Sequence, residues 1–421
     1  MSDAAGTNWS RNIRYSAERL VVPRTVDEVQ TIVADAAAVK TLGSRHSFNR
    51  IADTDGILLS LGDLDVPIEI DESRRRVRVG GGVRYGVLAR HLEDAGWALA
   101  NLASLPHISI AGAVSTGTHG SGVANRSLAA AVTGVDLVTS SGELISVSET
   151  DADLAGVVVG LGALGVVTTV ELAIEPSFEV AQTVYERIPF DEAIRAFDEI
   201  ASSAYSVSLF TTFRDHDVID QVWRKARTDA ASEALPELLV GLEARGPRHP
   251  LPGVSAQSCT IQGGEAGRWL DRLPHFRLEF TPSNGDELQS EFLLPRAHAG
   301  EALAAVRALA PVIAPMLQVC EVRTIAADDL WLSPAFGRDS VGLHFTWIAD
   351  GAGVAGVLPT LEAALAPFGA RPHWGKVFTE RTPQEWPELY PHWSDFAALR
   401  ERLDPRGAFA SDYLRALGLS R

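Results

Sequence analysis

Three segments of this 421-residue sequence carry polar side chains two positions apart on strand-like runs. The pairs are Gln289 and Glu291 in LQSEFLL, Glu321 and Arg323 in CEVRTI, and His344 and Thr346 in LHFTW. Because side chains alternate across a strand, each pair projects from one face. If the three strands are neighbours, they form a polar wall suited to a ligand rich in hydroxyls, since every buried polar group needs a partner. A solvated sheet face bearing a surface ion pair fits the same residues equally well.

Lysine is scarce in this chain, which has only Lys40, Lys225 and Lys376, while arginine supplies the other positive charges. Lys376 lies in the aromatic, histidine-bearing segment RPHWGKVF. The surroundings of a lysine can tune it as an acid or a base, which is not possible for arginine. Lys376 is therefore a candidate for proton transfer, with an ordinary surface ammonium as the alternative.

A glycine- and serine-rich segment, SLPHISIAGAVSTGTHGSG from Ser104 to Gly122, has the composition of a phosphate cradle. Its glycines let backbone N–H groups approach an anion closely, and its hydroxyls add uncharged donors. His46 lies in a second such turn, TLGSRHSFN, where a histidine on its own favours a structural role.

Two other glycine segments compete for the phosphate. Residues 160–165, GLGALG, match G-x-G-x-x-G, but a helix-like run precedes them and a strand-like run follows. This order is the reverse of the dinucleotide-binding fingerprint, so we expect a helix-to-strand turn there. Gly80, Gly81 and Gly82 lie between a strand and a helix but lack a third spaced glycine, which favours a simple turn.

Composition excludes several classes of protein. The chain has 37 basic and 54 acidic residues, a net charge of −17, and no basic cluster of the kind nucleic-acid binding needs. The longest uncharged run, 154–170, is too short and too rich in glycine for a membrane span. Cys259 and Cys320 cannot form a disulfide framework, and no apolar stretch follows the N-terminus, so we expect a cytoplasmic protein. No hydrolase, P-loop or zinc motif is present, and no metal site is expected.

Periodicity predicts an α/β N-terminal part, with helices at 26–38 and 85–96 and a strand at 74–79. A boundary is expected near Glu175-Pro176. The middle part combines a helix-like run at 190–204 with strand-like HFRLEFT and QSEFLL, which predicts α+β with an antiparallel sheet. Residues 235–267 are expected to form a surface excursion or lid. A helix at 395–403 and a turn at 404–409 close the chain.

Six motifs, in this order along the chain, resemble those of the FAD-linked oxidases of the vanillyl-alcohol oxidase type, and in detail those of the alditol (xylitol) oxidases. They are SRHSFN, GGGVRYGVLARHL, ASLPHISIAGAVSTGTHGSG, GALGVVT, HWGK and LDPRGAF. The resemblance implies a two-domain α+β fold. Residues 1–177, with 376–421 returning to them, would form the FAD-binding domain, and residues 178–375 a substrate domain with an antiparallel sheet.

The same resemblance implies that His46 is joined covalently to the ring methyl of the flavin. Further cofactor contacts would come from Leu42, Gly43, Ser44, Arg45, Ser47, Ser104, Ser109, Gly112, Thr116, Gly117, Thr118, His119, Val167 and His373.

The resemblance also places a polyol substrate at Ser104, Gln289, Glu291, Glu321, Arg323, His344, Thr346 and Lys376. We expect Lys376, its pKa lowered by burial and by the cation of Arg323, to work with His344 on the reacting hydroxyl. Glu321 and Arg323 would hold the neighbouring hydroxyls.

The expected function is oxidation of the terminal CH2OH of xylitol, sorbitol or similar alditols to the aldehyde, with hydride transfer to FAD and oxygen reduced to hydrogen peroxide. An aldonolactone oxidase or dehydrogenase on the same fold is one alternative. A polyol- or flavin-binding protein without turnover is another, although such a module has no need of a tunable base. The partners expected are the polyol and oxygen, with no nucleic acid and no membrane, and the chain is expected to be a monomer.

Overall fold

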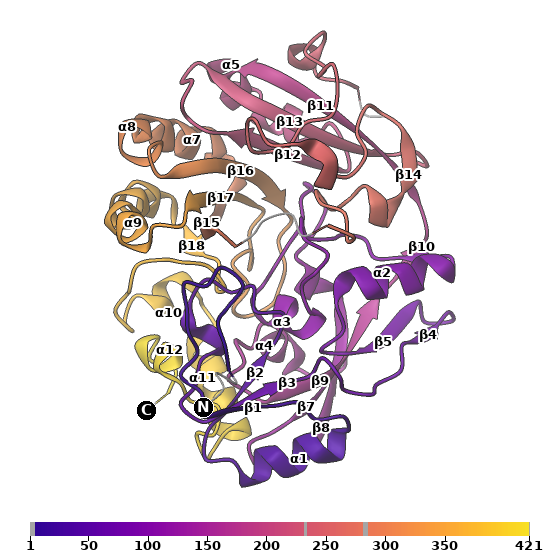
Figure 1. Cartoon of the computed structure of the whole chain (residues 1–421), viewed down its shortest axis with the longest axis vertical. Coiled ribbons are helices and arrows are strands. Elements are labelled where there is room, and N and C mark those ends of the chain that lie inside the picture. The colour runs from indigo at the N-terminus through magenta and orange to yellow at the C-terminus, as the bar shows by residue number, and fades with distance from the viewer. Residues whose placement is uncertain (1–4, 231–233, 281–284, 421) are drawn as a thin grey trace.

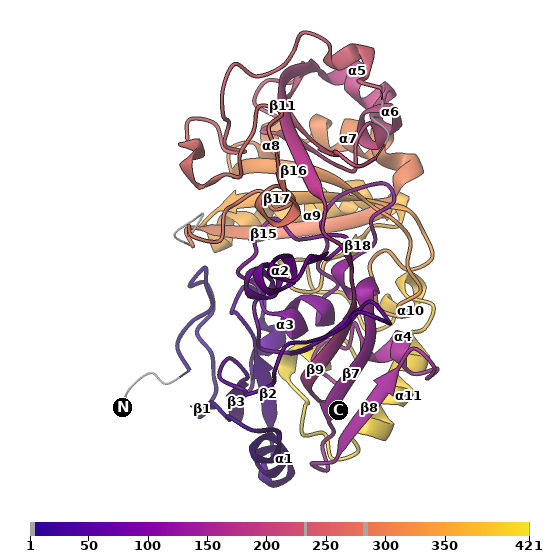
Figure 2. The ribbon, with the colours of Figure 1, turned by 90° about the vertical axis from the view of Figure 1, so that its right-hand side faces the viewer.

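The computed structural model describes residues 5–230, 234–280 and 285–420. Two main sheets organise the chain, one in the N-terminal part and a larger one in the middle part (Figure 1). The larger sheet lies across helices α2 (Tyr85–Asp94) and α3 (Ile110–Ser115), as the side view shows (Figure 2). The functional residues discussed below lie where these two parts meet.

The N-terminal part contains a small parallel sheet and a five-stranded antiparallel sheet. The parallel sheet has the order β1 (Arg19–Val21), β3 (Ile57–Ser60), β2 (Val39–Leu42), with α1 (Val26–Asp35) joining its outer strands. The antiparallel sheet has the order β4 (Glu69–Asp71), β5 (Arg76–Gly80), β9 (Val166–Ala173), β7 (Val132–Val138), β8 (Leu144–Ser148). A two-stranded ribbon of β6 (Trp97–Ala98) and β10 (Glu175–Pro176) lies between the two parts.

The middle part is built on an eight-stranded antiparallel sheet. Its strand order is β14 (Ala266–Arg268), β11 (Glu179–Pro189), β13 (Val218–Arg227), β12 (Ser206–Thr211), β16 (Leu317–Ile325), β17 (Ser340–Ile348), β15 (Glu287–Pro295), β18 (Arg371–Pro372). The expected α+β fold with an antiparallel sheet is confirmed. The three strands that carry the paired polar residues, β16, β17 and β15, are direct neighbours.

Side chains alternate along these strands, so one face of the sheet is polar and the other is apolar. Val322, Leu343 and Phe345 point into an apolar core that helices complete on the outer side of the sheet. These helices are α5 (Phe190–Arg195), α6 (Phe197–Ser202), α7 (Ala299–Ala308), α8 (Ala310–Ile313) and α9 (Gly351–Leu365). The polar residues that alternate with Val322, Leu343 and Phe345 therefore face the N-terminal part. Helix α9, together with the 3-10 turn that follows it, is long and apolar enough to cross a membrane by length and composition, and its buried face packs into this same core.

The C-terminal segment packs against the N-terminal part. Helices α10 (Trp386–Leu389), α11 (Trp393–Leu403) and α12 (Asp412–Ala416) share one apolar cluster with α2 and with the short α4 (Leu154–Val157). Figure 1 shows them in yellow beside the indigo and purple N-terminal elements. Trp374 lies at the centre of this cluster, with its ring 5.0 Å from that of Tyr390.

Some local predictions need correction. HFRLEFT is not a strand where the structure describes it, because its amides bond to loop carbonyls: His275 N donates to Ser104 O and Arg277 N to Ser258 O. Its last residue, 281, lies outside the described residues. The run 190–204 forms two short helices joined at Ala196. Residues 235–267 are mostly irregular, as expected, and bring His249 and Leu251 to the cavity described next.

Candidate active site

A cavity of about 520 Å³ lies between the polar face of the eight-stranded sheet and the glycine-rich loops of the N-terminal part. Its lining runs from Lys40 and Gly162, beside the small parallel sheet, to Phe210 and His249 of the middle part. It includes nearly all the site residues predicted from the sequence. These are Leu42, Gly43, Ser44, Arg45, His46, Ser47, Ser104, Ser109, Gly112, Thr116, Thr118, His119, Val167, Gln289, Glu291, Glu321, Arg323, His344, Thr346, His373 and Lys376.

Gly117 is the exception, since it does not line the cavity. Its φ of +68° turns the chain just after α3, and a Cβ there would meet the Pro334 ring at 3.0 Å. Gly117 is thus required by the path of the loop, and a direct contact with a ligand is not supported.

The polar wall follows from strand register. Glu321 on β16 pairs with His344 on β17, which pairs in turn with Glu291 on β15, while Thr346 pairs with Gln289. These side chains face the cavity because their neighbours on each strand point into the apolar core. The hypothesis that the three strands are adjacent is therefore correct, and a solvated sheet face is excluded because Glu291, Glu321 and Arg323 are all buried.

Glu291 is the anionic centre of this wall. Its Oε1 accepts from Arg323 Nη2 at 2.8 Å and lies 3.0 Å from His119 Nε2, while its Oε2 accepts from Lys376 Nζ at 2.8 Å. Burial by itself would raise the pKa of Glu291, but the cations of Lys376 and Arg323 hold that pKa well below its usual value. Glu291 is accordingly an ionised carboxylate that places two cations beside the cavity.

Lys376 is suited to act as a base because its surroundings lower its pKa. Burial lowers its pKa, and the ion pair with Glu291 offsets part of that shift. Next to it, burial and the Lys376 cation lower the pKa of His344 to about 4, so this imidazole is neutral. Neither ring nitrogen of His344 has a hydrogen-bond partner within the described residues, and Nδ1 lies 3.5 Å from Glu321 Oε2. The Nε2 atom of this neutral imidazole can bond a hydroxyl in the cavity.

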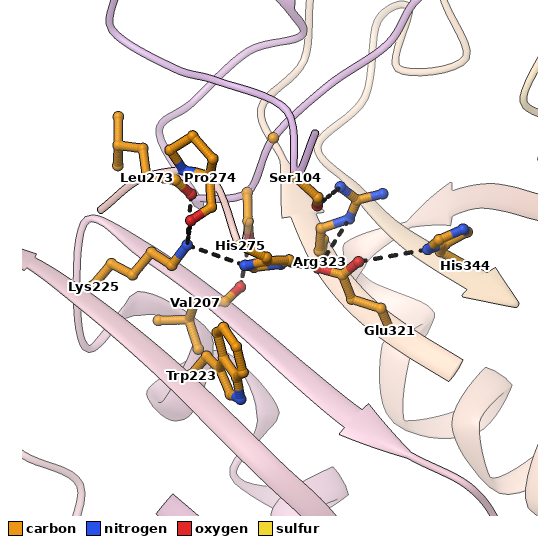
Figure 3. Close-up of polar contacts among 12 residues, drawn as sticks. Ser104, Val207, Trp223, Lys225, Leu273, Pro274, His275, Glu321, Arg323 and His344 are labelled. Atoms are coloured by element: carbon orange, nitrogen blue, oxygen red, sulfur yellow. Dashed lines mark hydrogen bonds and ion pairs between the residues drawn. The ribbon is translucent and has the colours of Figure 1, made fainter. Parts of the chain in front are cut away.

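The second carboxylate, Glu321, is held from the opposite side. Its Oε1 accepts from His275 Nε2 at 2.7 Å and lies 3.6 Å from Arg323 Nε (Figure 3). Burial would raise the pKa of Glu321, whereas Arg323 and His275 hold it well below its usual value. Arg323 also reaches Ser104 Oγ at 3.4 Å, so the wall and the glycine-rich loop meet at this guanidinium.

His46 lines the cavity from a strained turn. Arg45 before it adopts a positive φ of 65° and directs its guanidinium away to the carbonyls of Ala5 and Thr7. The imidazole stacks on Trp9 with ring centroids 5.4 Å apart, and burial lowers its pKa to about 4. Its Nδ1 has no partner within the described residues. His46 is thus a neutral, fixed imidazole with an unused nitrogen.

The loops of His46 and Lys376 are tied directly to each other. Phe48 N donates to Gly375 O at 2.7 Å, and the Asn49 side chain donates to the carbonyls of Trp374 and Lys376 at 2.7 and 2.8 Å. Segments more than 300 positions apart therefore form one rigid edge of the cavity.

The glycine loops fit a large planar cofactor. A Cβ at Gly43 would lie 2.6 Å from Ser109 Oγ, and one at Gly81 would lie 2.5 Å from the Val167 carbonyl. Ser109 Oγ is buried without a partner within the described residues. Glycine therefore lets these loops pack closely against one another beside the cavity, and the unpaired Ser109 hydroxyl is a donor that suits the diphosphate or ring edge of a dinucleotide.

Sequence reasoning missed several lining residues. Gly81 and Gly82 were interpreted as a simple turn, and His275 was placed in a strand. Lys225 lies behind His275 and is fully buried. The scarcity of lysine was a usable signal for Lys225, because all three lysines of the chain turn out to be largely buried.

Comparison with known proteins agrees with this site. Residues 17–148 match a family model described as an FAD binding domain, and residues 286–417 match one described as D-arabinono-1,4-lactone oxidase. The chain is 49% identical to an alditol oxidase of Streptomyces sp. (strain IKD472 / FERM P-14339), over 98% of this chain and 99% of the relative. It is 29% identical to L-gulono-1,4-lactone dehydrogenase of Mycobacterium tuberculosis, over 97% and 98% of the two chains. Among solved structures, cholesterol oxidase from B. sterolicum has the same fold, with a TM-score of 0.79 at 15% identity over 98% and 96% of the chains.

Proposed function

The chain belongs to the alditol oxidase family of FAD-linked oxidases, and on that premise we propose that it oxidises the terminal CH2OH group of alditols such as xylitol and sorbitol. The observation that carries this proposal is the pairing of Glu291 with Lys376 and Arg323 on a buried wall that also presents His344 and Glu321. The overall change is RCH2OH + O2 → RCHO + H2O2, in which the alcohol loses two electrons and two protons and oxygen gains them.

When bound, FAD supplies the hydride acceptor for the alcohol carbon. The protein has to remove the hydroxyl proton and hold that carbon in place. Lys376 and His344 line the same part of the wall, and both have a lowered pKa. Lys376 in its neutral form takes the hydroxyl proton, and His344 bonds the same oxygen and orients it.

The remaining wall residues bind the rest of the polyol. Glu321 accepts hydrogen bonds from hydroxyls, and Arg323, already fixed by Glu291 and Ser104, donates to them. Gln289 and Thr346 extend the wall along the chain of hydroxyls. Because each hydroxyl both donates and accepts, a wall with both kinds of group favours a neutral polyol over an apolar alcohol.

We propose that His46 carries the flavin covalently. The bond would join an imidazole nitrogen of His46 to the flavin ring methyl carbon and replace one N–H and one C–H bond, with oxygen as the acceptor of the two electrons and two protons released. The neutral ring held by Trp9 and its unused nitrogen support this assignment. We also propose that residues 1–177 and 376–421 form the FAD-binding domain, which is supported by the apolar cluster they share.

An aldonolactone oxidase or dehydrogenase is the second candidate, favoured by the match of residues 286–417 to a lactone oxidase model. Oxygen uptake and peroxide formation with xylitol, sorbitol and an aldonolactone separate the two. We expect stoichiometric peroxide with the alditols and little turnover of the lactone. Turnover of the lactone alone would establish the second candidate.

A further inference from the structure

A hydrogen-bonded chain runs from the cavity wall into the interior of the middle part. It links Glu321 on β16, His275 in the irregular segment before β15, and Lys225 on β13 (Figure 3). Lys225 Nζ lies 3.1 Å from His275 Nδ1, and His275 Nε2 lies 2.7 Å from Glu321 Oε1. Lys225 is only 1% exposed and does not line the cavity.

The hydrogen-bond geometry decides where the protons lie. Lys225 Nζ has three neighbours, Leu273 O at 2.5 Å, Pro274 O at 3.2 Å and His275 Nδ1. An ammonium has three donors and no acceptor, so three acceptors match it completely, whereas a neutral amine would aim its lone pair at one of them. Burial lowers the pKa of Lys225 to about 7, so the ammonium is the main form below neutral pH. His275 Nδ1 therefore accepts, and the single proton of the neutral ring is on Nε2, from which it is donated to Glu321.

Other features of the segment agree with a neutral His275. Burial and the neighbouring Lys225 cation lower the pKa of His275 to about 4. The ring is packed edge to face against Trp223 and Phe210, at centroid distances of 5.1 and 5.5 Å. His275 N also bonds the carbonyl of Ser104, so the segment is anchored to the glycine-rich loop.

We propose that Lys225 and His275 are positioning residues of the polyol site. The Lys225 ammonium fixes His275 as its neutral Nε2–H tautomer, and His275 then holds the Glu321 carboxylate ionised, with Oε2 turned toward His344 and the substrate hydroxyls. This inference rests on the proposed alditol oxidation. Lys225 does not line the cavity, and the Nε2–H of His275 is taken up by Glu321, so both act through Glu321.

Every charged or titratable group around Glu321 bears on how it titrates. Arg323 lies on the same strand, His344 on β17, and His275 with Lys225 on the opposite side. Glu291 on β15 lies next, with Lys376 and His119 bonded to it. The Arg323 and Lys225 cations balance the two carboxylates, and Lys376 adds a third positive charge whenever it is protonated. These cations disfavour protonation of Glu321.

The matched pair of variants is His275→Phe and His275→Gln. Phenylalanine keeps the aromatic packing but donates no hydrogen bond, whereas a glutamine amide donates from about the position of Nε2. Gln182→Met is the control, because Gln182 is buried on β11 opposite Lys225 and bonds the adjacent Thr260 and Ile261 but not His275.

Anaerobic flavin reduction, followed against xylitol concentration, gives a dissociation constant and a limiting rate for each variant. In wild type and Gln182→Met we expect the dissociation constant to stay constant between about pH 5 and 7. In His275→Phe it should be weaker by roughly tenfold or more, and weaken further as pH falls, because Glu321 now binds a proton. His275→Gln should restore most of the affinity. Equal losses in both variants, or a pH-independent loss, would overturn the proposal.

A second readout needs no turnover. Nitrogen-15 NMR of the imidazoles, assigned with His275→Gln, separates the two neutral tautomers from the imidazolium. We expect the Nε2–H tautomer in the wild-type holoprotein. In Lys225→Met burial still lowers the pKa of His275, but the Lys225 cation no longer does, so the imidazole should become protonated at a higher pH than in wild type. An Nδ1–H tautomer in wild type contradicts the proposal even if a variant fails to fold. If xylitol fails to reduce the wild-type flavin, the proposed function fails, while this NMR result still decides the proton positions.

Discussion

The Lys376 ammonium lies 2.8 Å from Glu291 Oε2, and Arg323 donates to the other oxygen of the same carboxylate. Glu291 therefore does not compete as a base at neutral pH, because two cations hold its pKa well below the usual value. Lys376, by contrast, has a lowered pKa through burial and can give up its proton at lower pH than an exposed lysine. The proton transfer that we propose for this site therefore falls to Lys376.

Replacing Lys376 tests that assignment. Lys376→Met keeps most of the buried volume but removes the titrating amine, so we expect flavin reduction by xylitol to slow by about 100-fold or more. The flavin content should stay unchanged, since Lys376 bonds Glu291 through its side chain and is tied to the His46 loop through its backbone carbonyl. Stopped-flow reduction measures the effect. A near-normal rate in a flavin-loaded variant would remove Lys376 from the mechanism.

The three lysines should react differently with an amine acylating reagent. Lys40 and Lys225 are each 1% exposed, whereas the Lys376 side chain is 13% exposed and lines the cavity. Burial lowers the pKa of all three, so access of the reagent decides which amine reacts. Native protein near pH 8 should be acylated at Lys376 before the other two, and xylitol should protect it. Peptide mass spectrometry reads the three sites separately. Equal labelling of all three would show that the burial is not as described.

Lys40 makes a prediction about stability. Burial lowers its pKa to about 7, against an ordinary value of 10.5, and its Nζ bonds Gly162 O at 2.9 Å. Between these two values the unfolded chain binds more protons than the folded one, so stability rises with pH across that window. The free energy of unfolding of wild type should therefore rise relative to that of Lys40→Met from about pH 7 to 10, by a few kcal/mol at most. Denaturant titrations at each pH measure this free energy, and the same pH dependence in both proteins would contradict the prediction.

His46 predicts how the flavin is retained. In wild type we expect a yellow pellet after acid precipitation, because a covalent link survives unfolding. In His46→Ala the colour should move to the supernatant, while folded protein still binds some FAD through the glycine loops. Colour that stays in the His46→Ala pellet would place the link on another residue.

The polar wall was largely predictable because it depends on periodicity. Two-residue spacing fixed the common face of Glu321 and Arg323, and the register then placed His344 between Glu321 and Glu291. Strand adjacency itself could only be assumed, since pairing between segments so far apart depends on tertiary packing.

The second layer behind the wall was not predictable. His275 follows Leu273-Pro274 in a run whose alternating apolar residues are typical of a strand, yet its backbone bonds Ser104 instead of a neighbouring strand. Lys225 lies on a real strand, but which face of that strand meets His275 depends on how the irregular segment folds back. Contacts of this kind arise from loop paths, which local pattern does not encode.

The most direct test of the account is anaerobic titration of the purified holoprotein with xylitol, followed by the visible spectrum of the flavin, with L-gulono-1,4-lactone as the comparison. We predict that xylitol bleaches the flavin band completely, that admitting oxygen restores it with one peroxide per flavin, and that the lactone bleaches it slowly if at all. A flavin that the lactone reduces and xylitol leaves yellow would contradict the assignment of this site to alditols.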